Sequence, residues 1–240
     1  MTFLREPPAD LVETRDALHQ LAYFAVSPSR YRKVGRMGLR PTHIGFGTPE
    51  FEGEVARVEG TLLVHETNDA AATQEITTVR EATRFFGGEY EVDWFTDFRD
   101  PLQPADPDAS LNIDVIAVGF IADWFAYGWD VLEKLKAHAI APDDVSEVQL
   151  WPEHFDPAVE LGDQDEGRRA SYGASPGDTQ HPEPYLYVAA WGEIDRSEKY
   201  WNDSSFNGSS LPYRVLLDSV DPVERALDFL LQGYGVLHTD

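Results

Sequence analysis

The longest run of closely spaced apolar residues lies in the middle of the chain, between Ser110 and Ala139. Apolar side chains recur there at intervals of three and four residues, which is typical of a helix buried around most of its circumference. The run is too long for one strand, and three aspartates within it argue against a membrane span. The pattern predicts a helix over 110–139, and the β-branched residues at 113–118 leave a short strand before the helix as the alternative.

The sequence before residue 99 and the sequence from residue 111 onward look like two diverged copies of one unit. When Pro41-x-His43 is aligned with Pro152-x-His154 without gaps, the apolar residues upstream also fall on apolar residues. A second shift aligns the apolar positions of 79–85 with those of 223–229, so the second copy is the longer one. Internal repetition of this kind indicates a duplicated supersecondary unit.

Each copy closes with a segment that begins like a capped helix. Thr78 precedes Glu81 by three residues, and Asp221 precedes Glu224 in the same way. A capping side chain with Glu three residues later satisfies free N–H groups of the first helical turn. The sequence therefore predicts an α+β protein of two pseudo-symmetric repeats, each a helix, a small mostly antiparallel sheet and a short capped helix.

The two repeats are expected at 1–98 and 111–240, packed together as one globular body. Residues 99–110 contain three prolines and three aspartates and are the expected linker. A chain of 240 residues is long enough to bury a sizeable core in this way.

Local patterns predict the remaining elements of the first repeat. The pair Asp10 and Glu13 indicates a capped helix, which Pro28 should end. The glycine-rich stretch 35–49 is predicted to be irregular, and it is followed by a strand over 54–66 that is interrupted at Gly60 and by a short strand over 74–77. The capping pair Thr78 and Glu81 predicts a helix over 79–86. Alternating apolar and acidic residues predict a half-buried strand over 89–98.

The same reasoning applies to the second repeat. The run 185–191 is the most strand-like in the chain, and Ser175-Pro176-Gly177-Asp178 has the residues of a tight turn. The other expected elements are a strand over 148–151 that continues at 155–161, a charged loop over 162–169, a polar loop ending at Ser210, a strand over 213–217 and a helix over 223–231.

The charge balance excludes several classes of partner. The formal net charge is −24, with 43 acidic and 19 basic residues. Such a surface repels phosphate backbones and anionic lipid, which argues against nucleic-acid and membrane partners. The basic cluster at 30–40 fits either a solvated loop or an anion-binding rim. The sequence leaves the oligomeric state open.

Two further observations concern compartment and chemistry. The chain has no cysteine, which excludes disulfides, thiolate catalysis and Cys-bound metals. Its N-terminal residues contain neither a basic nor an apolar leader segment, so a cytoplasmic location is expected.

Chemically useful side chains gather in the second repeat. The candidates are Glu153, His154, Asp156, Asp178, His181 and Glu183. Histidines and carboxylates beside a pair of strands suit a divalent metal with open positions, with His154, Asp156 and His181 as its ligands. The spacing matches no specific zinc signature, and acidic residues are abundant throughout the chain.

A general base is the alternative use of these histidines. Asp156 or Asp178 would orient His154 or His181, and Ser171 or Ser175 would be the nucleophile. Gly173-Ala174-Ser175-Pro176-Gly177 fits the bare pattern of a nucleophile elbow. However, proline has no N–H, so the oxyanion hole would lack its usual backbone donor.

Aromatic residues form the third signal. They are Tyr172, Tyr185, Tyr187, Trp191, Tyr200, Trp201 and Phe206. Aromatic walls with a few polar groups describe a small-ligand pocket, whereas the same residues on a strand also suit a core. The expected ligand-binding residues are His154, Asp156, Tyr172, Asp178, His181, Glu183 and Trp201.

Three motifs carry a resemblance to known sequences. They are the stretches 150–156, Tyr172-Gly173-x-Ser175-Pro176-Gly177-Asp178 and His181-Pro182-Glu183-Pro184-Tyr185. The chain resembles a family of uncharacterised actinobacterial proteins along most of its length. The resemblance implies a bacterial source and brings no activity, cofactor or assigned residue.

The leading hypothesis is a cytoplasmic small-molecule-binding protein without catalysis, which uses the aromatic cluster, His154, His181 and the nearby acids. One alternative is a metal-dependent hydrolase built on the same residues. The other is an adaptor that binds a protein through the aromatic loop 200–206.

Overall fold

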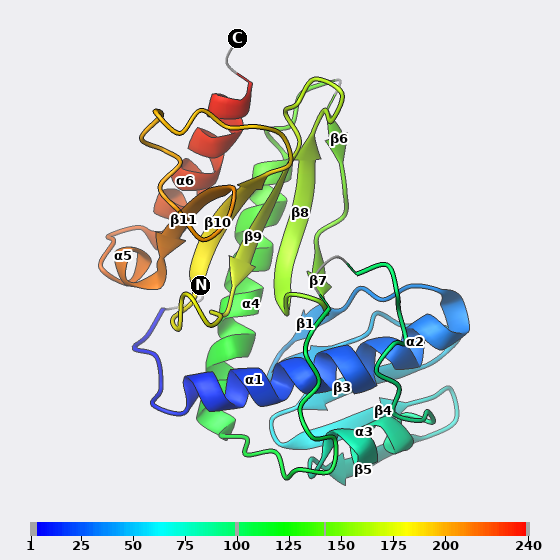
Figure 1. Cartoon of the computed structure of the whole chain (residues 1–240). Coiled ribbons are helices and arrows are strands. Elements are labelled where there is room, and N and C mark those ends of the chain that lie inside the picture. Colours follow the sequence, from blue (N-terminus) through cyan, green and yellow to red (C-terminus); the bar gives the residue numbers. More distant parts are fainter. Residues whose placement is uncertain (1–3, 99–100, 142, 239–240) are drawn as a thin grey trace. The chain divides into compact units, whose positions relative to one another are not determined.

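The structure is a computed structural model that describes residues 4–98, 101–141 and 143–238. It combines helices with two antiparallel sheets, which confirms the α+β class (Figure 1). The chain forms two compact units. The N-terminal unit comprises Pro7–Asp123 and Leu150–Phe155, and the C-terminal unit comprises Trp124–Gln149, Asp156–Asp240 and Met1–Glu6. The predicted linker 99–110, of which 99–100 lie outside the described residues, belongs to the N-terminal unit.

The N-terminal unit begins with a helix that does not end at Pro28. Helix α1 (Leu11–Leu21) continues into a π-helical turn, η1 (Ala22–Val26), and then into α2 (Ser27–Val34). Pro28 lies in the first turn of α2, and the carbonyl of Phe24, one helical turn earlier, receives no bond from it. The Thr83 hydroxyl lies within hydrogen-bond distance of that carbonyl, at 3.2 Å, and of the Val79 carbonyl in its own helix, at 2.9 Å, and shares its one proton between them. The predicted stop at Pro28 is therefore wrong, and the helix ends at Gly35, whose φ is 66°.

Two of the three predicted capping pairs are confirmed. The Thr78 side chain accepts a hydrogen bond from the Glu81 N–H at 3.2 Å, and Asp221 accepts from Glu224 N–H at 3.0 Å. The Asp10 side chain makes no such bond. The pair Asp10 and Glu13 was therefore interpreted wrongly, because the Glu13 carboxylate instead accepts from the Asn112 side chain at 2.8 Å.

The N-terminal unit contains one sheet, in which neighbouring strands follow each other along the chain. Its strands are β1 (Arg40–Thr42), β2 (Gly45–Gly47), β3 (Val55–Glu59), β4 (Leu62–Glu66) and β5 (Ala71–Glu75), and helix α3 (Val79–Phe85) follows. The glycine-rich stretch 35–49, predicted to be irregular, thus contains a hairpin. Gly60, with a φ of 59°, lies in the turn between β3 and β4, where the strand was expected to be interrupted.

The segment 89–98 was predicted to be a strand and is irregular in the structure. Its large side chains pack against Tyr23 and Phe24 of η1, with the ring of Trp94 5.6 Å from that of Tyr23 and the ring of Tyr90 5.3 Å from that of Phe24. Tyr90, Trp94 and Phe98 recur every four residues, a spacing that would also place them on one face of an extended strand, so the sequence pattern does not decide the backbone conformation. Packing onto the helix thus overrides the alternation.

The long apolar segment forms helix α4 (Val115–Lys136). It starts later than predicted because Asp114 accepts a hydrogen bond from the Ala117 N–H at 2.8 Å and so caps the first turn. Within the described part of the chain it is the one helix long and apolar enough to cross a membrane. Of its most apolar window 61% is buried inside the protein, as in the core helix of a soluble protein.

The sheet of the C-terminal unit has the order β11-β10-β9-β8-β6. Its strands are β6 (Asp144–Val145), β8 (Asp156–Gly162), β9 (Ala170–Ser175), β10 (Tyr185–Ala190) and β11 (Gly208–Pro212). Strand β7 (Gln149–Trp151) precedes β8, and the two are separated by the turn 152–155 rather than forming one continuous strand.

The chain ends with α5 (Tyr213–Leu217) and α6 (Pro222–Leu237). The predicted strand over 213–217 is wrong, because Tyr213 and Leu216 are buried at helical spacing. The strand near this position is β11, which overlaps the last residues of the predicted polar loop and ends at Pro212. The predicted helix over 223–231 is confirmed as the first part of α6.

Helix α4 lies very close to β9 at Gly128. A Cβ atom on Gly128 would lie 2.4 Å from the Cβ of Ala174, so Gly128→Ala forces the helix and the strand apart. We expect this variant to lower the free energy of unfolding by about 2 kcal/mol. Gly235→Ala, in α6 with no heavy atom within 4 Å of the new methyl group, should raise it by about 0.5 kcal/mol. Urea denaturation measures both, and equal stability of the two variants would contradict the close approach.

Candidate functional site

The turn 176–184 between β9 and β10 is held by the side chain of Asp178. Its Oδ1 atom accepts from the N–H groups of Gln180 at 2.6 Å and of His181 at 2.8 Å. The Asp178 N–H donates to the His181 carbonyl at 2.7 Å. Gly177, whose φ is 101°, permits the left-handed backbone that this turn requires. The connection 176–184 is longer than the tight turn predicted over 175–178, with its bends at 179–180 and 182–183, and it fixes the position of His181.

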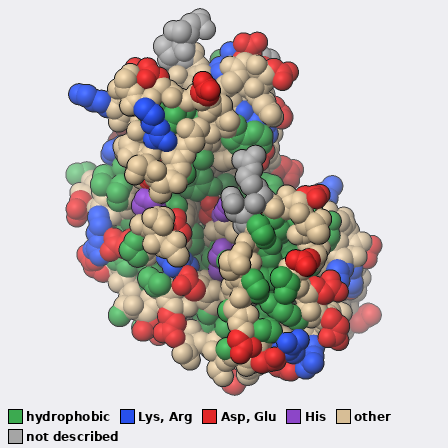
Figure 2. All heavy atoms as spheres, in the orientation of Figure 1, with side chains coloured by type: hydrophobic (Ala, Val, Ile, Leu, Met, Phe, Trp, Pro, Cys, Tyr) green, Lys and Arg blue, Asp and Glu red, His purple; other side chains and the backbone are tan. Residues whose placement is uncertain are grey.

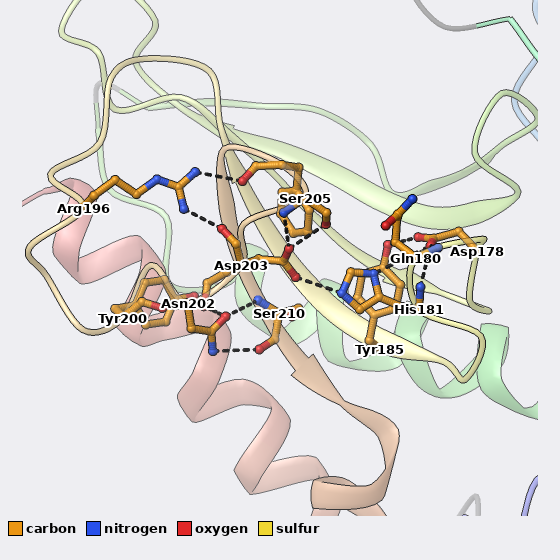
Figure 3. Close-up of polar contacts among 12 residues, drawn as sticks. Asp178, Gln180, His181, Tyr185, Arg196, Tyr200, Asn202, Asp203, Ser205 and Ser210 are labelled. Carbon is orange, nitrogen blue, oxygen red and sulfur yellow. Dashed lines mark hydrogen bonds and ion pairs between the residues drawn. The ribbon is translucent and has the colours of Figure 1, made fainter.

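A second segment, in the loop between β10 and β11, also approaches His181. The buried carboxylate of Asp203 accepts from the Ser205 N–H at 2.9 Å and from the Ser205 hydroxyl at 2.6 Å. The Arg196 guanidinium donates to the carbonyls of Asp203 and Phe206, at 2.5 Å and 2.9 Å. These bonds order the loop and point the Asp203 carboxylate at His181 (Figure 3).

The His181 imidazole lies between two carboxylates. Its Nε2 atom is 3.1 Å from Asp203 Oδ2 and its Nδ1 atom is 3.6 Å from Asp178 Oδ1. The ring centroid lies 4.5 Å from that of Tyr185, whose hydroxyl donates to Asp178 Oδ2 at 2.6 Å. The imidazole is 28% exposed, so part of it is accessible to solvent. We call Asp178, His181, Tyr185 and Asp203 the His181 cluster.

The charge state of the His181 cluster follows from these contacts. Burial raises the pKa of Asp203, but hydrogen bonds from Ser205 and Ser210 and the charge of His181 outweigh it and leave the pKa below its usual value. Burial, together with the neighbouring Asp178 carboxylate, raises the pKa of the Tyr185 phenol. At neutral pH the cluster therefore contains an ionised Asp203 and a protonated Tyr185 hydroxyl.

The other predicted residues of the C-terminal unit have partners inside the fold. Asp156 is buried and accepts from the Tyr187 hydroxyl at 2.6 Å. Glu183 forms an ion pair with Arg214 at 2.8 Å. Tyr172 and Trp201 are buried, so these two aromatic residues belong to the core, which was the alternative to a ligand-binding wall.

Tyr172 lies near a second polar group that the sequence did not indicate. The Asp143 side chain is fully buried and accepts from the Tyr234 hydroxyl at 2.5 Å and contacts His238 Nε2 at 3.0 Å. Burial raises the pKa of Asp143, but the bonds from His238 and Tyr234 lower it below its usual value. These contacts fasten the end of α6 to the segment before β6, and we assign them a structural role.

His154 belongs to the N-terminal unit. It is 59% exposed, with Nε2 4.0 Å from the Glu153 carboxylate, in the turn 152–155. The imidazole of His19 holds this turn, because its Nε2 lies 3.0 Å from the Pro152 carbonyl and 3.1 Å from the Glu153 carbonyl. Phe155 closes the turn with a φ of 54° and stacks on His19.

The predicted metal site is not found. In the described ranges no group of three or more histidine, aspartate or glutamate side chains is arranged to hold a metal ion. The predicted set of His154, Asp156 and His181 is not among such groups: Asp156 accepts from the Tyr187 hydroxyl, and His181 lies against Asp203. The metal site therefore stays a prediction.

The possible serine nucleophiles are also engaged. Ser175 Oγ accepts from the Gly177 N–H at 3.1 Å, and Ser171 Oγ accepts from the Trp191 indole at 3.0 Å. Sequence reasoning found Asp178 and His181 but missed Asp203. Its only signal is the local pattern Asp203-x-Ser205, which is common in surface loops.

The fold and the His181 cluster define an α+β protein of two units, of which the C-terminal one carries a histidine between two carboxylates. Comparison with known protein families gives no match to the chain. No curated protein and no solved structure matches it significantly. Function is therefore argued from the geometry.

Proposed function

We propose that the protein binds a small cationic ligand at the His181 cluster and does not catalyse a reaction. The observation that carries the proposal is the position of the His181 imidazole, between the carboxylates of Asp178 and Asp203 and against the ring of Tyr185. The ligand class follows from the charge of these groups.

A cation fits the cluster better than an anion. Two carboxylates face one imidazole, and the Asp178 side chain is 41% exposed and can receive an additional donor. The protein as a whole carries a net charge of −24, and acidic side chains are scattered over the face drawn in Figure 2. This charge raises the local concentration of cations around the site.

The absence of catalysis is part of the proposal. A covalent mechanism needs a nucleophile next to a base, and the hydroxyls of Ser171 and Ser175 are hydrogen-bonded within the sheet and the turn. A hydrolase that uses a metal needs a group of ligands of a kind not found in the described residues.

The test is a melting and calorimetry screen with putrescine, spermidine and choline as probes, and succinate as the anionic control. We expect an amine to raise the melting temperature and Asp178→Asn to weaken its binding by about tenfold, the loss expected for one charged partner. Glu183→Gln is the matched control, because Glu183 lies in the same turn but is paired with Arg214. Equal binding of succinate, or equal losses in both variants, would contradict a cation site at His181.

We further propose that the two halves of the sequence, 1–98 and 111–240, descend from a duplication. Three observations support it. In each sheet neighbouring strands are close in sequence, and His43 follows β1 as His154 follows β7. Leu39 and Leu150, which the repeat aligns with each other, form an antiparallel bridge with hydrogen bonds of 2.8 Å and 2.9 Å. Superposition of the two sheets should bring His43 onto His154, and a mismatch would reject the duplication. That the protein has neither nucleic-acid nor membrane partners is proposed from its net charge alone.

A further inference from the structure

The outer strands of the two sheets differ in how they are protected. Strand β1 contains Pro41 and is preceded by the bridge between Leu39 and Leu150. Strand β6 has two residues only. On β11, the Asn202 side chain accepts from the Ser210 N–H at 3.0 Å and donates to the Ser210 carbonyl at 3.1 Å, so it occupies the place of a neighbouring strand. Proline, short length and covering groups are the usual means of blocking a sheet edge.

Strand β5 has none of these protections. It is the outer strand of the N-terminal sheet, it is largely exposed, and it contains no proline or lysine. The hydrogen bonds that flank its pairing with β4 join Ile76 to Thr61 at 3.0 Å and Thr67 to Ala70 at 2.8 Å. Because bonded pairs alternate along an antiparallel ladder, the N–H and C=O groups of Ala71, Thr73 and Glu75 point away from β4. Within the described part of the chain no hydrogen bond to these groups is found.

We propose that β5 is a docking edge, which accepts an extended, lysine- or arginine-containing segment of a partner protein as an additional strand. Main-chain hydrogen bonds to Ala71, Thr73 and Glu75 provide the affinity in this mode of binding. The proposal concerns the N-terminal unit and is independent of the cation site in the C-terminal unit.

The surroundings of β5 favour a basic partner with apolar side chains. Glu75 is the last residue of β5, Asp69 lies two residues before its start, and β5 carries no basic residue. At the Glu75 end, Leu62 pairs with Glu75 and is 37% exposed. Val115 is 60% exposed and lies beside Gly60, two residues before Leu62. A second copy of this chain is disfavoured as the occupant, since both copies carry a net charge of −24.

The test uses a fluorescent eight-residue peptide of alternating lysine and valine, with binding measured by anisotropy at physiological salt. Thr73→Pro removes an outward N–H group without removing a bond to β4, so the sheet should tolerate it. Thr73→Ala keeps the N–H group and is the matched control. We expect Thr73→Pro to weaken binding by about tenfold or more and Thr73→Ala by less than about twofold.

Peptide controls and amide exchange separate strand addition from attraction by charge alone. The same peptide with a central proline, and one of alternating glutamate and valine, should bind at least about tenfold more weakly. Amide exchange at Ala71, Thr73 and Glu75 should slow when the lysine peptide is added. Ala71→Pro, which removes another outward N–H group, should act like Thr73→Pro and replaces it if that variant does not fold.

Two results would overturn the proposal. The first is a lysine peptide that binds equally to the wild type and to a folded proline variant, because strand addition then plays no part. The second is a dimer, seen by light scattering, that the proline substitution abolishes while the peptide does not bind, since the occupant is then a second copy.

Discussion

Trp124→Ala should lower the free energy of unfolding by about 4 kcal/mol, the upper part of the range for a truncated core residue. The Trp124 side chain is buried in α4, with its ring 5.4 Å from those of Tyr127 and Tyr213. Its indole N–H donates to the Ser175 carbonyl at 2.8 Å, at the end of β9. Alanine removes both the aromatic packing and the donor, and urea denaturation of the full chain measures the loss.

Trp124→Phe separates the two contributions. It preserves most of the ring packing and leaves the Ser175 carbonyl without its indole donor, so we expect a smaller loss of about 1–2 kcal/mol. Val220→Ala is the control, because Val220 is fully exposed and should change stability by less than about 0.5 kcal/mol. A Trp124→Ala protein as stable as this control would mean that α4 is not packed against β9 as described.

The second large effect is a loss of stability in acid that depends on His19. Burial lowers the pKa of His19 from 6.5 to about 4, against smaller opposing effects of the Pro152 and Glu153 carbonyls. The folded protein thus keeps this imidazole neutral, whereas the unfolded chain takes up a proton below pH 6.5. The stabilisation is complete above pH 6.5 and is lost as the pH falls toward 4. Because the ring is only partly shielded from solvent, we expect a loss of about 2–3 kcal/mol.

Comparison with a variant isolates this contribution from the protonation of carboxylates. His19→Gln has no imidazole to titrate, so its unfolding free energy should fall less steeply between pH 6.5 and 4 than that of the wild type. His43→Gln, at an exposed position, should retain the steep decline. Parallel curves for the wild type and His19→Gln would show that His19 is protonated in the folded state.

The elements predicted correctly are those specified by local signals. Helix α4 follows from a long apolar period, α3 and α6 from the capping residues Thr78 and Asp221, and β10 from its β-branched and aromatic run. The errors occur where a distant contact decides the structure. Pro28 does not end its helix, since it lies in the first turn of α2 after the π-helical turn η1 and the distant Thr83 hydroxyl lies within reach of the carbonyl left free. The aromatic residues of 89–98 pack on η1 instead of forming a strand.

The candidate site was predicted only in part, because local spacing in the sequence reveals some of its contacts and distant contacts decide the others. Asp178 and His181 lie three residues apart in one turn, so their proximity is a local property. Asp203 reaches His181 from a loop beyond β10, which no spacing in the sequence reveals. His154 and Asp156 are near neighbours in sequence, yet one is exposed in a turn and the other is buried at the start of β8. Proximity in sequence did not imply a shared role.

The bond between Thr83 and the Phe24 carbonyl also links two positions that are far apart in sequence. The hydroxyl of Thr83 has an acceptor there because Pro28 cannot donate to that carbonyl. With proline at 28, a residue without a hydroxyl at 83 would leave the Phe24 carbonyl without that donor, whereas a non-proline residue at 28 would remove this particular need for a hydroxyl at 83. Evolutionary change at these two positions is therefore coupled, and the order in which substitutions arise decides which of them the fold tolerates.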